Sequence, residues 1–429
     1  MGARGAPGEC TCARDRHAVC ILMDNLGKTG LRKNTPVARQ VAWPTDFRFT
    51  LPSMSLQYLP RFSLVAVGLG CSSAAAPFLT IGDGAELFLT GGLGMRADDN
   101  IYLAKDATSD LIFELTPGAE LSFGKNAQFK AKLTLVDAFT SYSDHSGLNT
   151  NLFSADFASR FDDGKLRLGY DLSFHELNQN SFDARPTLAG QTPGLVRRDN
   201  FGTTFSGETE LTQKTAAATS ISFVRDNYKR AGYADTDSVT VPVDFYYRLT
   251  PKTDLSLGYR YRDTTVDIGQ DSTDYFFNVG ARGEFSPKLT GRFAVGLNRR
   301  QVSNGGDANQ LGLEAKFAYE LTPKTTLEFG ASNDFGTSPQ GQQLKNKQMN
   351  GLITAKLTPE WRVNGGLSWR TINYGARTDD YWEAQVGTTF IVSTNVRIVG
   401  NYYYRIYSSD VRLNEFRNNV FSVAANFRY

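Results

Sequence analysis

The sequence lacks the features by which most membrane and redox proteins are identified. Its 429 residues contain four cysteines and three histidines, and no run of 18 apolar residues. Without such a run we expect no transmembrane helix. The cysteines are Cys10, Cys12, Cys20 and Cys71, so the chain beyond residue 71 is free of thiols. That composition suits an oxidising compartment, in which stray thiols are a hazard.

Groups for catalysis and metal binding are also scarce. Beyond residue 75 the only histidines are His145, in a Ser/Asp-rich stretch, and His175, beside Glu176. We expect these to be hydrated or lumen-lining side chains. No His/Asp/Glu cluster has ligand spacing, and Cys10-x-Cys12 has no second pair. Asp98-Asp99-Asn100 offers calcium ligands but is more typical of a solvated turn. The sequence therefore predicts no enzyme, metal or cofactor.

The first 53 residues do not share the pattern of the rest. They contain scattered cysteines and prolines, with no helix or strand periodicity. We interpret residues 1–53 as upstream sequence translated in error before the true start at Met54. A genuine disordered or targeting extension is the alternative.

A secretory signal peptide is predicted over residues 54–75. Arg61 precedes an apolar stretch at 62–69, and a cluster of small residues follows it. Cleavage after Ala75 would make Ala76 the first mature residue and leave a short periplasmic lead-in at 76–84. A lipoprotein site at Cys71 is the alternative, but the residues before it lack the expected aliphatic side chain. From Ala76 onward acidic residues slightly outnumber basic ones, so no nucleic-acid partner is expected.

A recurrent turn signal organises the remaining chain. Pro251, Pro287, Pro323 and Pro359 stand 36 residues apart, each behind a threonine or serine. Proline presets φ for a tight turn and cannot donate to a sheet ladder. Polar turns without proline extend the series at 124–126, 162–165, 212–214 and 393–395. These eight turns join strands in pairs, and with one further strand at each end they predict 18 strands.

The predicted strands alternate between apolar and polar residues. In one of them Leu257 and Tyr259 lie on one face, with Arg260 and Arg262 on the other. A soluble sandwich also alternates, but its strands average about five or six residues, whereas these are long enough to cross a bilayer. Turns are short at one end and connections long at the other. The chain from 85 to 429 therefore predicts an all-β, transmembrane antiparallel up-and-down barrel.

The predicted inner face is rich in arginine in the second half of the chain. Such arginines should pair with neighbouring carboxylates, and any surplus would favour anions. Aromatic residues at inward positions would suit stacking on sugars. The longest connection, 177–197, is the only one with the length of an inward-folded constriction loop. The pore-lining candidates are Arg260, Arg262, Arg282, Arg292, Arg300, Arg362, Arg370, Arg397, Arg405 and Glu314, and the stacking candidates are Tyr246, Phe276 and Tyr403.

The C-terminal strand, predicted over 420–429, ends the chain on an aromatic residue. Phe421, Val423, Phe427 and Tyr429 share one face of it. A terminal aromatic with apolar residues at alternate positions is similar to the signal by which the outer-membrane barrel-assembly machinery recognises its substrates. We therefore expect that machinery to be a partner.

Three short motifs resemble the β-barrel porin type 2 family. They are the sequence Met95-Arg96-Ala97-Asp98-Asp99-Asn100-Ile101, the repeated Thr-Pro turns, and the ending that runs from Asn418-Asn419-Val420 to Asn426-Phe427-Arg428-Tyr429. The resemblance covers about residues 85–429. It implies an outer-membrane barrel of about 18 strands that acts as a conduit, in some members for secreted polysaccharide, and it transfers no catalytic residues.

The sequence as a whole predicts an outer-membrane channel, with export of a polysaccharide as the first hypothesis. A general or anion-biased diffusion porin is the main alternative, and a barrel enzyme or structural barrel is more distant. Expected partners are outer-membrane lipid and lipopolysaccharide, together with the polysaccharide and the periplasmic components that deliver it.

Overall fold

The computed structural model describes residues 76–82, 84–125, 127–180 and 194–429. The predicted extension at 1–53 and signal peptide at 54–75 lie outside these residues. The described chain forms one sheet of 20 strands with two 3₁₀ turns, η1 (Ser146–Leu148) and η2 (Arg412–Asn414). Within it, no helix has the length and apolar character needed to span a membrane.

The strands follow one another around the sheet in chain order. Their bounds are β1 (Leu79–Ile81), β2 (Ala85–Asp98), β3 (Asp110–Leu115), β4 (Gly118–Phe123), β5 (Phe129–Tyr142), β6 (Thr150–Asp162), β7 (Leu166–Asn178), β8 (Arg197–Glu210), β9 (Thr215–Tyr228), β10 (Thr236–Thr250), β11 (Thr253–Val266), β12 (Ser272–Ser286), β13 (Leu289–Val302), β14 (Ala308–Thr322), β15 (Thr325–Thr337), β16 (Gln343–Lys356), β17 (Trp361–Asn373), β18 (Thr378–Ile391), β19 (Val396–Ser409) and β20 (Phe416–Arg428).

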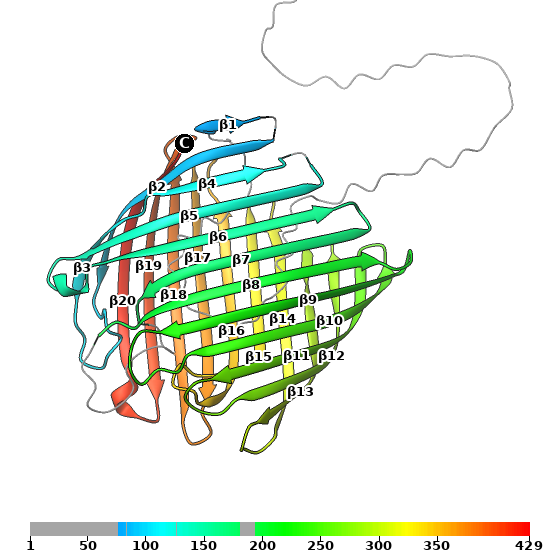
Figure 1. Ribbon diagram of the computed structural model, residues 1–429. Helices are drawn as coiled ribbons and strands as arrows, with labels where there is room; N and C mark the ends of the chain where they lie inside the picture. Colours follow the sequence, from blue (N-terminus) through cyan, green and yellow to red (C-terminus); the bar gives the residue numbers. More distant parts are fainter. Residues whose placement is uncertain (1–75, 83, 126, 181–193) are drawn as a thin grey trace, which may run out of the picture. The chain divides into compact units, whose positions relative to one another are not determined.

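The sheet closes into a barrel between its first long strand and its last. β2 pairs with β20 from Thr90↔Arg428 to Asp98↔Val420, and the two lie side by side in Figure 1. β3 and β4 together fill one position between β2 and β5, and β1 pairs only with the start of β2. Eighteen strand positions therefore surround the lumen, and the predicted 18-stranded antiparallel barrel is confirmed.

The recurrent prolines lie in the short turns, and the residue before each proline shows why the motif repeats. Thr250 Oγ1 accepts a hydrogen bond from the Lys252 backbone N–H at 3.2 Å, and Thr322 Oγ1 accepts one from Lys324 at the same distance. The hydroxyl satisfies a turn N–H that the ladder leaves unpaired, and the proline fixes φ beside it. The Thr-Pro-Lys sequence thus contains both the side chain that caps the turn and the proline that fixes its backbone angle.

The strands extend further than predicted toward the long connections. The last strand begins at Phe416 rather than at residue 420, and it ends at Arg428. Tyr429 follows the strand and exchanges backbone hydrogen bonds of 2.7 and 2.8 Å with Leu89. Three of the four extra residues, Arg417, Asn418 and Asn419, are polar, so hydrophobic alternation did not predict them.

The outer face of the barrel is apolar. Large hydrophobic side chains at alternate positions project outward and stay exposed, among them Leu257 at 62% and Leu367 at 64%. Exposed apolar area of this extent would be unfavourable in water. In the outer membrane it contacts lipid, which accounts for the two-residue alternation of the strands.

Candidate functional site in the barrel lumen

The lumen is filled at the end where the long connections lie. Buried charged and polar side chains gather on the strand ends nearest those connections, including Arg262, Asp274, Arg300, Asp379 and Asn418. Outer-membrane barrels place their longer loops outside the cell, so we call this the outer end. The candidate site is therefore the region between the outer mouth and the middle of the lumen.

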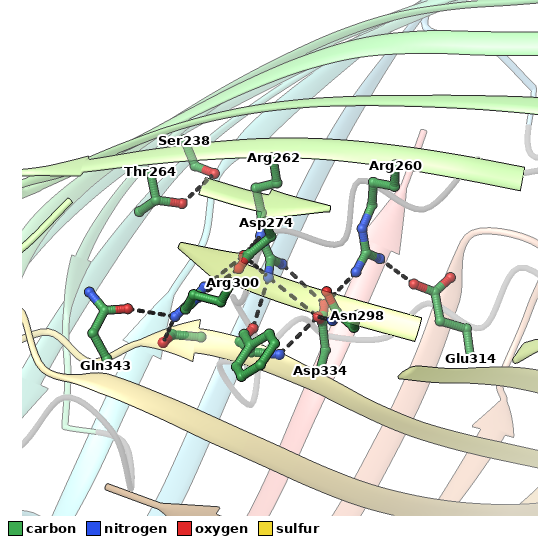
Figure 2. Close-up of polar contacts among 12 residues, drawn as sticks. Ser238, Arg260, Arg262, Thr264, Asp274, Asn298, Arg300, Glu314, Asp334 and Gln343 are labelled. Atoms are coloured by element: carbon green, nitrogen blue, oxygen red, sulfur yellow. Dashed lines mark hydrogen bonds and ion pairs between the residues drawn. The ribbon is translucent and has the colours of Figure 1, made fainter. Parts of the chain in front are cut away.

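A group of arginines and carboxylates, which we call the arginine cluster, occupies this region on the side of β11–β15. Its centre is Asp274 on β12, 1% exposed and held between Arg262 and Arg300 (Figure 2). Arg262 Nε donates to Asp274 Oδ2 at 2.8 Å, and Arg300 Nε donates to Oδ1 at 2.6 Å. Both arginines are 2% exposed, so the charges are shielded from water and compensate each other.

Asp334 of β15 completes the arginine cluster. Its carboxylate accepts hydrogen bonds from Arg260 Nη2 at 2.9 Å, Arg262 Nη1 at 3.1 Å and Asn298 Nδ2 at 2.6 Å. Arg260 also pairs with Glu314. Arg260 lies on β11, four strand positions from β15, so these contacts form across the interior of the barrel.

Asp334 reaches the cluster because the end of the β15–β16 hairpin leaves the wall. Pairing between β14 and β15 stops at Leu313↔Asn333, whereas β15 continues beside β16 to Thr337↔Gln343. We call residues 334–344 the inner hairpin, because β16 pairs with β17 from Lys345 onward. Its backbone is fastened by Arg300 Nη1, which donates to Gly336 O at 2.5 Å and to Gln343 Oε1 at 2.6 Å.

The tip of the inner hairpin contacts the β9–β10 connection, five strand positions from β15. The Ala234 backbone N–H, in the β9–β10 connection, donates to Pro339 O at 2.8 Å. Five strand positions separate β10 from β15, a path of roughly 24 Å along the wall at about 4.8 Å per strand. A direct backbone contact over that path requires a segment that projects into the mouth. Gln343 Nε2 adds a bond to Gln270 O at 2.6 Å, in the β11–β12 connection.

A second segment, the connection between β2 and β3, also turns inward. We call residues 99–109 the first loop. Leu103, 6% exposed, belongs to an apolar cluster with side chains of β16–β20, namely Leu344, Ile372, Tyr381, Tyr407 and Phe416. Ile101 joins a second apolar cluster with Ile112 and Tyr142 on the other side. The first loop is thus anchored at two places on the inner wall.

The local backbone of the first loop supports this anchoring. Leu103 has φ of 49°, a left-handed conformation that leucine rarely adopts. It is held by the Leu103 N–H, which donates to Asn100 O at 3.0 Å, and by the Ala104 N–H, which donates to Asn100 Oδ1 at 3.0 Å. Asn100 therefore presents Leu103 to the apolar cluster.

Connection 177–197 was the only candidate for an inward-folded loop by length, and length did not identify the first loop. The first loop is shorter than that connection and folds inward because Ile101 and Leu103 provide apolar anchors. The position of apolar residues, and not loop length, determines whether the loop folds inward. Residues 181–193 of the longer connection lie outside the described residues. Near its stem, Asn180 Nδ2 donates to Tyr102 O at 2.9 Å, which ties that connection to the first loop.

The predicted stacking residues are inward but are covered by arginines. Phe276 is 2% exposed and lies beneath Arg260, whose guanidinium is 5.0 Å from the ring centroid. Arg282 stands 3.4 Å over the ring of Tyr246. Tyr403 is half-buried, with Arg405 at 5.3 Å. Phe276 therefore offers no face to a sugar in this structure, which residue parity could not reveal.

The predicted pore-lining arginines separate into two groups. Arg260, Arg262 and Arg300 meet in the arginine cluster, while Arg282 bonds Glu208 and Arg405 bonds Glu383, both at 2.8 Å. Arg282 on β12 and Glu208 on β8 are four strand positions apart, so pairing is not confined to neighbouring strands as expected. The remaining four lie away from the cluster: Arg292 and Arg362 are half-buried, Arg370 is buried and Arg397 is exposed.

The two terminal motifs meet where the barrel closes. Asn418 Nδ2 donates to Asp98 Oδ1 at 2.7 Å, and the Asn419 side chain and backbone N–H both donate to Asp99 at 2.6 Å. These carboxylates are satisfied by amides. In the described part of the chain no group of three or more His, Cys, Asp or Glu side chains is placed to hold a metal ion.

Each histidine lies beside one carboxylate. His145 Nδ1 is 2.7 Å from Asp110 Oδ2, which also accepts the His145 backbone N–H at 3.1 Å, and His175 Nε2 is 3.1 Å from Asp156 Oδ1. The Asp110 carboxylate accepts backbone hydrogen bonds from the start of the connection that leads into η1. The contact organises a loop, in agreement with its position in the sequence.

Comparisons with known proteins give a family and a set of structural neighbours. A family model described as "Putative beta-barrel porin 2" matches residues 91–429. The outer membrane protein OpdK from Pseudomonas aeruginosa is 10% identical with a TM-score of 0.45, over 80% of this chain and 99% of that chain. OccAB2 from Acinetobacter baumannii is 11% identical with a TM-score of 0.45, over 80% and 98%.

A third solved structure, described as a bacterial polysaccharide outer membrane secretin, is 9% identical with a TM-score of 0.37, over 82% of this chain and 100% of that chain. No curated protein matches the sequence.

Proposed function

Because the protein belongs to the family of outer-membrane barrels described as "Putative beta-barrel porin 2", we propose that it is a channel closed at its outer end at rest. We further propose that the solute it passes is a polysaccharide leaving the cell, delivered by periplasmic export components.

The observation that carries this proposal is the pair of segments that cross the lumen at the outer end. Leu103 of the first loop and Leu344 of the inner hairpin belong to one apolar cluster with residues of β17–β20. A barrel of 16–18 strands is wide enough to hold an aqueous channel. An exporter needs such a channel to be closed between substrates, because an open one would let small solutes leak.

The two segments differ in how firmly they are held, which indicates which of them moves. The inner hairpin is fixed by the buried ion pairs of Asp334. Removing one partner from such a pair costs about 3–5 kcal/mol. The first loop has no ion pair among residues 99–109 and relies on the burial of Ile101 and Leu103, each worth about 1.5–3 kcal/mol, and on a few hydrogen bonds. A sugar chain advancing from the periplasm would therefore displace the first loop while the inner hairpin stays in place.

The wall below these segments suits a hydroxyl-rich solute. On β16–β19 the lumen face carries Asn350, Asn364, Gln385 and Asn401, of which Asn364 and Asn401 flank Gly387 in the register. Side-chain amides both donate and accept hydrogen bonds, as sugar hydroxyls do. This chemistry favours a glycan without demanding a particular charge.

The second candidate is a general or anion-biased diffusion porin. The inner hairpin favours it, because a fixed inward segment is also how a diffusion pore sets its size limit. The arginine cluster adds little anion bias in either case, since its guanidiniums are paired with Asp274, Asp334 and Glu314.

The C-terminal strand is the proposed point of recognition by the barrel-assembly machinery. Phe421, Phe427 and Tyr429 are exposed on the outer side at 53%, 49% and 56%. Val423 shares their alternation. Such a row is accessible to a partner before the barrel meets β2 and closes.

The experiment that separates the two candidates is removal of the protein from its own cells. Export predicts that surface polysaccharide falls and that polysaccharide accumulates in the periplasm, while uptake of small sugars is unchanged. A diffusion porin predicts the reverse, with slower uptake of small solutes and normal surface polysaccharide.

A further inference from the structure

Three basic residues stand directly opposite one another on the lumen wall below the arginine cluster. Arg282 of β12 pairs in register with Arg292 of β13, and Arg292 pairs with Lys316 of β14. Paired residues of an antiparallel sheet project from the same face, with Cβ atoms about 4.5–5.5 Å apart. Because Arg282 reaches Glu208 across the interior, that face is the lumen. We call these three residues the cationic row.

The members of the cationic row differ in whether they have partners. Arg282 is bound by Glu208 and Asp254. Among the residues that the structure describes, no carboxylate lies within ion-pair distance of Arg292 or Lys316. The nearest acidic residues in register have other partners or stand farther off. Glu314 is bound to Arg260, and Glu284, diagonal to Arg292, is bound to Lys252. Glu328 is diagonal to Lys316 but beyond ion-pair distance, and Asp244 acts on Arg292 only at longer range.

Like charges directly opposite each other destabilise a sheet. Ion pairs compensate this cost at Arg282. At Arg292 and Lys316 no ion pair does so, in contrast to the arginine cluster, where each guanidinium meets a carboxylate. Arg292 is half-buried and Lys316 is exposed to the lumen, so both side chains are reachable by a solute. A site that costs stability and remains accessible is typical of a binding site.

Small and neutral residues lie around the cationic row, and the Asn350 amide lies over Gly330 beside Lys316. At the next level toward the outer end, the lumen face carries Gly280 and Ala294 in register with Glu314, and Gly330 lies opposite Lys316 on β15. Lys316 is two residues from Glu314, roughly 7 Å along the strand. A solute held here would lie immediately below the arginine cluster and the inner hairpin.

We propose that Arg292 and Lys316 form a subsite for the carboxylate of an acidic sugar unit in the exported chain. A guanidinium binds a carboxylate through two parallel hydrogen bonds, and an ammonium adds a compact second charge. This subsite rests on the proposed function, because it names the class of polysaccharide as acidic. Neutral amides on β16–β19 contact the sugar hydroxyls, and the cationic row contacts the charge.

The test is isothermal titration of the purified, detergent-solubilised protein with hexagalacturonate, and with maltohexaose as the neutral probe of equal length. The wild type binds hexagalacturonate more tightly than maltohexaose. Changing both Arg292→Gln and Lys316→Gln weakens hexagalacturonate binding by at least about tenfold, which corresponds to the loss of one good charge-assisted hydrogen bond. The charge-retaining variant R292K/K316R keeps most of the affinity.

A matched control removes the same charge from the turns that flank these strands. Lys288→Gln with Lys324→Gln deletes two positive charges from the neighbouring turns and leaves binding within about twofold. The thermal stability of the lumen variant stays equal to the wild type or rises, because a repulsion has been removed. Equal losses in the lumen and turn variants, or no preference for the acidic probe, overturn the subsite.

Failure of the subsite and failure of the proposed function give different results. Conductance in planar bilayers, recorded on the same preparation, reports on closure of the mouth and does not need the ligand. A silent wild type that ignores hexagalacturonate overturns the subsite alone. A wild type that conducts freely and binds hexagalacturonate through Arg292 and Lys316 overturns the closed channel alone.

Discussion

Replacing Leu103 should release the first loop without unfolding the barrel. Leu103 is 6% exposed inside an apolar cluster made by five other residues. Truncation of a buried leucine to alanine costs about 2–5 kcal/mol in a protein core. The first loop is a surface segment that relaxes on truncation, so we take about 2 kcal/mol, which changes the ratio of anchored to released loop by roughly 30-fold.

Limited proteolysis on intact cells measures that ratio. Lys105 is exposed in the first loop, two residues beyond Leu103, and trypsin cleaves it when the loop leaves the mouth. Leu103→Ala should raise the rate of cleavage at Lys105 by about the same factor, because proteolysis follows the population of the open form. The melting temperature of the barrel should stay close to that of the wild type.

The control is Leu413→Ala, at a leucine that is 68% exposed in the β19–β20 connection. It removes the same atoms from a position that anchors nothing, so cleavage at Lys105 should not change. Unchanged cleavage in Leu103→Ala, or equal acceleration in both variants, would refute the role given to Leu103.

Three further predictions concern the wall, the arginine cluster and processing. Leu367→Arg, on the lipid face at mid-strand, should cost roughly 2–4 kcal/mol and hinder assembly. Ser368→Arg, on the lumen face opposite Glu383, should assemble normally. Equal yields of the two folded barrels from the outer membrane would show that the register is wrong. Asp274→Asn should lower stability by about 3–5 kcal/mol, because Arg262 and Arg300 lose their shared carboxylate; a melting temperature equal to the wild type would contradict the account of the cluster. N-terminal sequencing of the outer-membrane form should begin Ala76-Pro77-Phe78-Leu79, and a mature chain that retained residues 1–53 or a lipid on Cys71 would exclude the predicted cleavage.

The wall of the barrel was predictable because its signals are local. Alternation in a strand such as β11 and the Thr250-Pro251 turn depend on residues within a few positions of each other. The contact between β2 and β20 that closes the barrel was also indicated by the sequence. Its residues Asp98, Asp99, Asn418 and Asn419 belong to the motifs that carried the family resemblance. Their meeting follows from the antiparallel order once the strands have been counted.

The filling of the lumen could not be predicted in the same way. Arg282 finds Glu208 only after the sheet has closed, and no local pattern links residues four strand positions apart. Asp334 keeps the inward parity of Ser332, but its partner Arg260 lies four strand positions away and no local pattern links the two. Ile101 and Leu103 are apolar residues inside a polar connection, and this pattern could have predicted that the first loop folds inward. Loop length alone does not predict it.

Closure of the outer mouth by the first loop is measured most directly by single-channel recording in planar bilayers. The wild type is compared with a variant in which a short Gly-Ser link replaces residues 102–108. A control carries the same link in place of residues 303–307, in the exposed β13–β14 connection. We predict that the wild type and the control show no steady conductance and that the first-loop variant conducts continuously. Steady conductance in the wild type equal to that of the first-loop variant would contradict the account.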